Sequence, residues 1–381
     1  MNTEIPGVLF IVNSLCFGGA EKHVVSLLNN LDTTRFRLLL AYLKPEETLL
    51  PQIDVQRLQA VFCCDVGKKI DWRCVRRLAH EIESGRVDVL VCTNTYSMLY
   101  GFLARWLSHR PVKIIEVFHT TLLQTPKDKL QMMFYRPFFK SCDLLMYVCE
   151  NQRSYWRKQG LRGKTDQVIH NGVDTEYFSE NCSHEEKFLL RARYGFAAND
   201  YVVGICAALR PEKAHGDLLQ AVRRLRDKGI SAKCLIIGDG VERSSIEKQI
   251  AQLDLSGHVA ITGFQKDVRP FVASTDVMVI VSHAIETFSI AALESMSLGK
   301  SMVMSKIGGA EEQIQEGWNG YVFPPGDINQ LTGHLDTLAD DQKRSSLSVN
   351  ARQRVVDHFS LPVMVRRYEH ALYSTLGLSH V

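Results

Sequence analysis

Two glutamates, Glu286 and Glu294, stand with seven residues between them, where an apolar run at 276–282 passes through a short loop into a second apolar stretch at 291–299. The first run is typical of a buried strand and the second of a helix. In open α/β sheets, ligands bind where strands end, and the first amides of a helix attract anions. We therefore expect a ligand site at this junction of strand and helix.

The backbone and the two carboxylates suit different parts of such a ligand. We expect the amides of Phe288, Ser289 and Ile290 to face a diphosphate, with the helix dipole behind them. Glu286 can accept hydrogen bonds from sugar hydroxyls, and Glu294 can take both hydroxyls of a ribose. The alternative is an acidic helix start plus one surface glutamate, and the two residues alone do not exclude it.

Positive charge is expected at a second strand end. Arg210 and Lys213 follow the apolar run 201–207. There they would neutralise a leaving diphosphate, as an alternative to a metal ion. A solvated charged turn is the alternative.

The first half of the chain offers two further positions. Gly18 and Gly19 follow the apolar run 8–12 and open a helical segment, where glycine lets backbone amides approach a phosphate or a sugar closely. A tight connection between strand and helix would also use them. His119 ends the run 113–118, and a histidine at a strand end can equally be a structural hydrogen-bonding group.

The elements that position these residues alternate along the chain. Short β-branched runs recur between longer amphipathic stretches, which predicts parallel strands linked by helices, and the rhythm restarts after residue 200. The fold class is therefore α/β, with two doubly wound domains. We expect an N-terminal domain at 1–185, a C-terminal domain at 186–360, and a last amphipathic helix within 361–381 that packs back on the first domain.

Composition limits the classes of protein. The 381 residues carry a net charge of only +3, which does not favour nucleic acid as a partner. Ten cysteines without metal-ligand spacing indicate reduced thiols, and neither a signal peptide nor a membrane span is expected. The predicted localisation is cytoplasmic.

Two basic and aromatic clusters lie in the first half. One surrounds Trp72, and the other flanks the aromatic stretch 133–139; their basic members are Lys68, Lys69, Arg73, Arg76 and Arg77, and Lys127, Lys129, Arg136 and Lys140. Such a face could rest on anionic lipid at the inner side of the cell membrane, or be a solvated helix face with aromatics in the core.

The segment 286–294 resembles the Glu, seven residues, Glu motif of family 4 retaining glycosyltransferases, the glycosyl transferases of group 1. Three downstream segments agree with the family pattern in order: Gly308-Gly309-Ala310-Glu311-Glu312, Gly317-Trp318-Asn319-Gly320 and Pro325-Gly326-Asp327. The loop 17–21 (FGGAE) and the turn 171–174 (NGVD) also match, so the resemblance covers nearly the whole chain.

The resemblance implies the GT-B architecture, in which two Rossmann-like domains face each other. It implies that Glu286 binds the donor sugar, that Glu294 binds the ribose, and that His119 contacts the sugar. Gly240 and Phe264 then lie in loops on the nucleotide side. One position departs from the family, because Ala208 stands where an arginine is usual, and Arg210 is displaced from that place by two positions.

The implied activity is transfer of a hexose-type sugar, with retention, from a nucleotide diphosphate sugar such as a UDP-sugar to a hydroxyl of a glycan or lipid-linked acceptor. Neither a metal nor another cofactor is expected. The resemblance further implies a role in bacterial polysaccharide or lipopolysaccharide synthesis. A nucleotide-sugar epimerase of the same fold and a non-catalytic sugar-nucleotide-binding protein are the alternatives.

Overall fold

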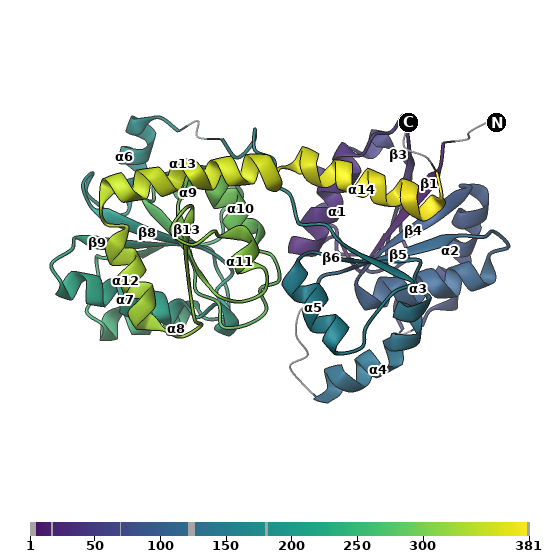
Figure 1. The fold of residues 1–381 in the computed structure, drawn as a ribbon, viewed down its shortest axis with the longest axis horizontal. Helices are drawn as coiled ribbons and strands as arrows, with labels where there is room; N and C mark the ends of the chain where they lie inside the picture. Colours follow the sequence, from purple (N-terminus) through teal and green to yellow (C-terminus); the bar gives the residue numbers. More distant parts are fainter. Residues whose placement is uncertain (1–4, 17, 69, 121–125, 180–181, 379–381) are drawn as a thin grey trace. The chain divides into compact units, whose positions relative to one another are not determined.

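The computed structural model describes residues 5–16, 18–68, 70–120, 126–179 and 182–378. The chain divides into two compact units, Met1–Asn171 with Leu361–Val381, and Gly172–Ser360. Each unit is an α/β body built on one parallel sheet, as the alternation of apolar and amphipathic segments predicted (Figure 1).

The first unit contains a seven-stranded sheet in the order β3-β2-β1-β4-β5-β6-β7. Its strands are β1 (Gly7–Val12), β2 (Arg37–Tyr42), β3 (Leu58–Cys63), β4 (Val87–Thr93), β5 (Lys113–Phe118), β6 (Leu144–Tyr147) and β7 (Thr165–Val168). Its helices are α1 (Gly19–Asn30), α2 (Trp72–Ser84), α3 (Asn94–Leu107), α4 (Pro126–Ser141), α5 (Glu150–Lys158) and α14 (Leu361–Leu376), with short 3₁₀ turns η1 (Leu50–Gln52) and η2 (Val55–Arg57).

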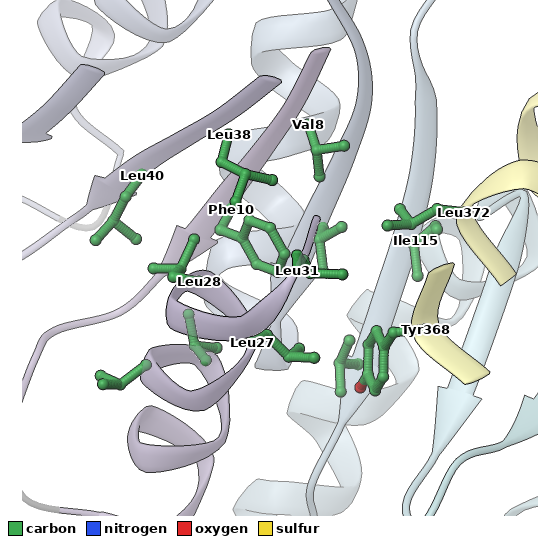
Figure 2. Packing of buried hydrophobic residues seen from close by; sticks show 14 of the residues in the cluster. Val8, Phe10, Leu27, Leu28, Leu31, Leu38, Leu40, Ile115, Tyr368 and Leu372 are labelled. Carbon is green, nitrogen blue, oxygen red and sulfur yellow. The ribbon is translucent and has the colours of Figure 1, made fainter. Parts of the chain in front are cut away.

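Alternate residues of β1 serve the two faces of this sheet, as the two-residue period of a strand requires. Val8 and Phe10 join a core that α1 and α14 cover, and Figure 2 shows Leu27 of α1 and Tyr368 of α14 in it. Leu9 and Ile11 point into the opposite core, beneath α2 to α5. The C-terminal helix is thus part of the first unit.

The second unit contains a six-stranded sheet in the order β10-β9-β8-β11-β12-β13. Its strands are β8 (Tyr201–Cys206), β9 (Ala232–Ile237), β10 (Val259–Ile261), β11 (Val277–Ile280), β12 (Met302–Ser305) and β13 (Gly320–Phe323). Its helices are α6 (His184–Arg193), α7 (His215–Asp227), α8 (Arg243–Gln252), α9 (Arg269–Ala273), α10 (Ile290–Ser297), α11 (Ala310–Gln313), α12 (Ile328–Thr337) and α13 (Asp341–His358), with the 3₁₀ turn η3 (Pro211–Lys213).

The boundary expected near residue 185 lies inside the second unit, which begins at Gly172. The reason is a set of contacts made by residues 173–178. The Val173 amide donates to the Phe359 carbonyl at 2.9 Å, and the Ser297 hydroxyl donates to the Phe178 carbonyl at 2.7 Å. The polar composition of the connector did not reveal these backbone contacts.

Candidate functional site

Lys213 and Glu286 come together at neighbouring strand ends in the second unit. Lys213 ends η3, which follows β8, and Glu286 lies in the loop between β11 and α10. Because β8 and β11 are adjacent in the sheet, their carboxyl-terminal loops meet. The Lys213 ammonium lies 2.6 Å from Glu286 Oε2, and both side chains are mostly buried.

The carboxylate of Glu286 has a second partner that the sequence analysis missed. The Ser282 hydroxyl donates to the same Oε2 at 3.3 Å. Two donors therefore hold one oxygen of this carboxylate. The other oxygen, Oε1, is not used by either contact.

Backbone contacts fix the loop that carries Glu286. The Gly309 amide donates to the Thr287 carbonyl at 2.7 Å, and the Gln313 side-chain amide donates to the Ser289 carbonyl at 2.8 Å. Gly308 approaches so closely that a Cβ there would lie 2.0 Å from the Glu286 carbonyl oxygen. The segment Gly308-Gly309 therefore sets the position of the loop that carries Glu286. This explains why the two glycines belong to the family pattern.

The start of α10 is a capped helix N-terminus. Ser289 is its N-cap, and the Ser289 hydroxyl accepts a hydrogen bond from the Ala292 amide at 3.3 Å. Phe288 is buried, and its ring packs edge-on against Phe359 with centroids 5.3 Å apart. Because its side chain is buried, Phe288 can offer only its backbone to a ligand. The first amides of the helix, including that of Ile290, have no carbonyl partner within the helix.

Glu294 is buried on α10. This excludes the alternative in which it is an ordinary surface glutamate. A donor-binding role is predicted for this carboxylate. That role, on the ribose, stays a prediction.

Arg210 behaves differently from Lys213. Its side chain is exposed, and in the described part of the chain its guanidinium forms no ion pair. Ala208, at the place where the family usually has arginine, is exposed as well. The structure therefore joins Lys213 to Glu286 and leaves the charge-neutralising role of Arg210 as a prediction.

Close backbone packing marks the loop of Gly240. A Cβ at Gly240 would lie 2.5 Å from the Leu209 carbonyl oxygen, and the Leu209 amide donates to the Asp239 carbonyl at 3.0 Å. Gly263, with φ +74°, forms an isolated bridge with Gly238. Phe264 follows with an exposed ring. The loops after β8, β9 and β10 are thus held together at one end of the sheet.

His283, which sequence reasoning missed, holds the loop of Glu286 in place through two contacts. His283 Nε2 lies 2.6 Å from Asp217 Oδ2 on α7, and the His283 amide donates to the Glu212 carbonyl at 2.9 Å. His283 stands three residues before Glu286, so its closeness in sequence was an available signal. Asp217 offered no such signal, because it lies 66 residues from His283.

The residues predicted in the first half gather in the first unit. Gly18 is the N-cap of α1 and Gly19 its first residue; a Cβ on Gly18 would collide with the Glu21 carboxylate. His119 follows β5, and its backbone amide donates to Asn94 Oδ1 at 3.2 Å. The loop residue Phe17 and the cluster residue Lys69 lie outside the described residues.

A buried histidine of α1 connects these positions. The rings of His23 and His119 meet edge to face with centroids 5.4 Å apart, and His23 Nε2 lies 2.7 Å from the Tyr368 hydroxyl of α14. Burial lowers the pKa of His23 to about 3, helped by the charge of His119, and lowers the pKa of His119 to about 4. Both imidazoles are therefore neutral at pH 7, and sequence reasoning missed His23 and Tyr368.

Two absences concern the described residues only. No group of three or more His, Cys, Asp or Glu side chains among them is placed to hold a metal ion. None of the described helices is both long and apolar enough to cross a bilayer.

The fold matches that of solved glycosyltransferases. The structure of Anabaena HepE in complex with UDP superposes with a TM-score of 0.84 at 23% identity, covering 97% of this chain and 100% of that one. Two Rossmann-like parallel-sheet units with loops gathered at strand ends are the GT-B class of fold.

Sequence comparison assigns the family. The profile described as Glycosyltransferase Family 4 matches residues 17–177, and the profile described as Glycosyl transferases group 1 matches residues 186–354. An uncharacterised glycosyltransferase of Methanocaldococcus jannaschii is 30% identical over 285 residues, 72% of each chain. The lipopolysaccharide 1,2-N-acetylglucosaminetransferase of Salmonella typhimurium is 23% identical, over 65% of this chain and 67% of that one. The chain belongs to the family 4 glycosyltransferases.

Proposed function

We propose that this glycosyltransferase moves a hexose-type sugar from a UDP-sugar to a hydroxyl of a glycan or lipid-linked acceptor, with retention at the anomeric carbon. The observation that carries the proposal is the contact between Lys213 and Glu286 at the strand ends of the second unit. The complexes of HepE with UDP and UDP-glucose support the choice of UDP. The Salmonella relative supports a role in lipopolysaccharide or polysaccharide synthesis.

The proposed chemistry centres on the charge of the leaving group. As the bond to the sugar breaks, negative charge develops on the diphosphate oxygen. Lys213 and the first amides of α10 would stabilise that charge, and Arg210, at the start of the same 3₁₀ turn as Lys213, would add a second cation. A leaving diphosphate that these groups stabilise requires no metal ion or other cofactor.

Glu286 would then serve the sugar, and Glu294 the ribose. Retention through a covalent intermediate needs a carboxylate nucleophile and a carboxylic acid about 5 Å apart around the scissile bond. The proposed roles assign the two glutamates to different parts of the donor. We therefore propose attack on the same face of the sugar that the diphosphate leaves.

For His119, in the first unit, we propose a contact with the sugar. Its neutral imidazole at pH 7 can accept or donate one hydrogen bond to a sugar hydroxyl. In this proposal the first unit receives the acceptor and the second holds the donor. We place the enzyme in the cytoplasm, peripheral to the inner face of the membrane.

A thermal-shift screen across nucleotide sugars tests the donor. A UDP-sugar should raise the melting temperature more than the matching GDP-sugar, because only a ligand bound to the folded state stabilises it. Release of UDP with an acceptor present, and an anomeric configuration retained in the product by NMR, should follow. Added chelator should leave the rate unchanged.

Two results would contradict the proposal. An epimeric sugar nucleotide formed from donor alone would favour the epimerase. Tight donor binding without hydrolysis or transfer, across lipid-linked and soluble acceptors, would favour a binding protein.

A further inference from the structure

Three cysteines gather where β3 ends and α2 begins. Cys63 is the last residue of β3, Cys64 follows it, and Cys74 lies in the first turn of α2. Successive residues of a strand point to opposite faces of a sheet. Cys63 accordingly packs against the core that α1 and α14 cover, whereas Cys64 and Cys74 belong to the opposite core. Cys64 therefore faces Cys74 and is turned away from its neighbour in the sequence.

The side chains of Cys64 and Cys74 share a hydrogen bond. Regular elements fix both ends of this pair. The Cys64 amide donates to the Tyr42 carbonyl at 2.8 Å, which continues the pairing of β3 with β2. Cys74 belongs to α2, whose N-cap Asp71 accepts a hydrogen bond from the Arg73 amide at 3.0 Å. The two thiols are therefore held together by a strand end and a helix.

The two thiols differ in acidity and in access to solvent. The hydrogen bond with Cys74 lowers the pKa of Cys64, and so does the charge of Arg77, while burial and the Asp71 carboxylate oppose this shift. The same hydrogen bond, together with burial, raises the pKa of Cys74. Cys64 is half-buried and Cys74 is buried. The reactive thiolate is therefore favoured at Cys64, with a protonated thiol beside it.

Arg77 is itself fixed next to this pair. Its guanidinium donates to the Cys63 carbonyl at 2.7 Å and lies 4.5 Å from the centroid of the Phe62 ring. A cysteine that senses oxidants combines a favoured thiolate, access to solvent and a neighbouring second thiol. Cys64 has all three properties. Burial has the opposite effect on Cys63, whose pKa it raises.

We propose that Cys64 and Cys74 form a site of reversible oxidation, at which a peroxide converts the two thiols to a disulfide. The Cys64 thiolate attacks one oxygen of hydrogen peroxide, the O–O bond breaks, and the other oxygen leaves as hydroxide, which takes up a proton to become water. The product on Cys64 is a sulfenic acid. The Cys74 thiol then attacks the sulfur of this sulfenic acid, so that the S–S bond forms and the S–O bond breaks. The second water leaves with the proton of Cys74.

The electrons balance, because the two thiols lose the two electrons that the peroxide gains. A dithiol reductant reverses the reaction by thiol–disulfide exchange. Where a compartment keeps thiols reduced, disulfides are transient and often sense oxidants, so a reduced resting pair agrees with the proposal. A structural zinc site would need four ligands, and no group of three or more suitable side chains lies among the described residues. The proposal concerns thiol chemistry alone and is independent of the transfer reaction.

The test is peptide mapping after oxidation of the folded full chain. The reduced protein is treated with a small excess of hydrogen peroxide, catalase removes the remainder, and the protein is unfolded in an excess of alkylating agent. Trypsin cuts after Lys68 and Arg73, between the two cysteines. Mass spectrometry should find the peptides of Cys64 and Cys74 linked to each other, and dithiothreitol should separate them.

Variants assign the bridge. Cys63→Ser is the matched control and should keep it, because Cys63 faces the other core. Cys64→Ser should abolish the linked peptides. Cys74→Ser should leave a sulfenic acid on Cys64 that dimedone captures, and Cys74→Ala should give the same result if serine disturbs the core.

A second measurement follows the alkylation of Cys64 by iodoacetamide in the folded protein. Arg77→Gln should slow this reaction, because a charge that favours the thiolate is lost. Arg76→Gln removes an exposed charge next in the sequence and should leave the rate unchanged. Linked peptides that persist in Cys64→Ser, or a bridge between Cys63 and Cys64, would overturn the proposal. So would a reducible dimer joined through Cys64, or a Cys64 that stays reduced while peroxide oxidises other cysteines.

Discussion

Gly308 offers a sharp test of whether the loop that carries Glu286 must be held in place. Gly308→Ala adds one methyl group whose carbon would lie 2.0 Å from the Glu286 carbonyl oxygen and 2.5 Å from the Thr287 carbonyl oxygen. Such contacts are essentially never closer than 3.0 Å, so the loop has to move by about 1 Å. The hydrogen bond from the Gly309 amide to Thr287 would be strained by the same movement.

The expected magnitude follows from that displacement. A misplacement of 1 Å near reacting groups can cost on the order of 100-fold in rate. The methyl group also carries a backbone cost, because Gly308 has φ +53°, and a left-handed conformation costs a residue with a Cβ roughly 1–2 kcal/mol. Only the first effect is specific to the loop.

Gly317→Ala is the matched control. Gly317 has φ +70°, but a Cβ there would meet nothing within 4 Å. Both variants therefore carry the same kind of backbone cost, and Gly308→Ala should lose more stability in thermal unfolding because of the added clash. Steady-state release of UDP should show kcat/KM falling on the order of 100-fold in Gly308→Ala. Gly317→Ala should keep the wild-type value.

The reasoning is refuted if folded Gly308→Ala retains the wild-type kcat/KM. The position of the 286–288 backbone would then be irrelevant to turnover, and the donor would have to bind elsewhere. An equal loss in both variants would assign the effect to backbone strain instead.

Three further predictions concern the charged and titratable groups. Lys213→Met should lower kcat tenfold or more, because a charge-stabilising group is lost. The loss should exceed that of Arg210→Met, because of the two residues only Lys213 contacts Glu286. Equal losses in the two variants would contradict this ranking. Glu294→Gln should weaken donor binding in calorimetry, and an unchanged Kd would remove the ribose role. Burial lowers the pKa of His23 to about 3 and that of His119 to about 4, so the unfolded chain takes up protons first as the pH falls. The contribution of these two imidazoles to stability should therefore be fully present above pH ~6.5 and be lost progressively toward pH ~4, as urea unfolding would show; His119→Gln should flatten this part of the slope.

The sequence predicted the central strands but missed the strands at three sheet edges. Buried central strands read as continuous apolar runs, as in β1 and β11. The missed strands β3, β7 and β13 lie at sheet edges. Their residues are largely half-buried, so they lack the apolar run by which a strand is recognised.

The candidate site was predictable to the extent that its parts are local. The spacing of Glu286 and Glu294, and the glycines at 308–309, lie within one stretch of chain. The pairing of Lys213 with Glu286 joins residues 73 positions apart, and it follows only from β8 and β11 being neighbours. The glycines at 308–309 were recognised in the sequence. Their close contacts with the carbonyl groups of Glu286 and Thr287 appear only in the tertiary structure.

The sequence by itself determined the fold class, the family and the loops that form the candidate site, because apolar periodicity and motif spacing are properties of neighbouring residues. Tertiary structure alone decided that Glu294 is buried, that Tyr368 of the last helix reaches His23 of the first, and that Leu130, Met133 and Phe134 face outward on α4. Burial and contact depend on which elements pack together. A helix with apolar residues on two faces cannot reveal, from its sequence, which face the core will cover.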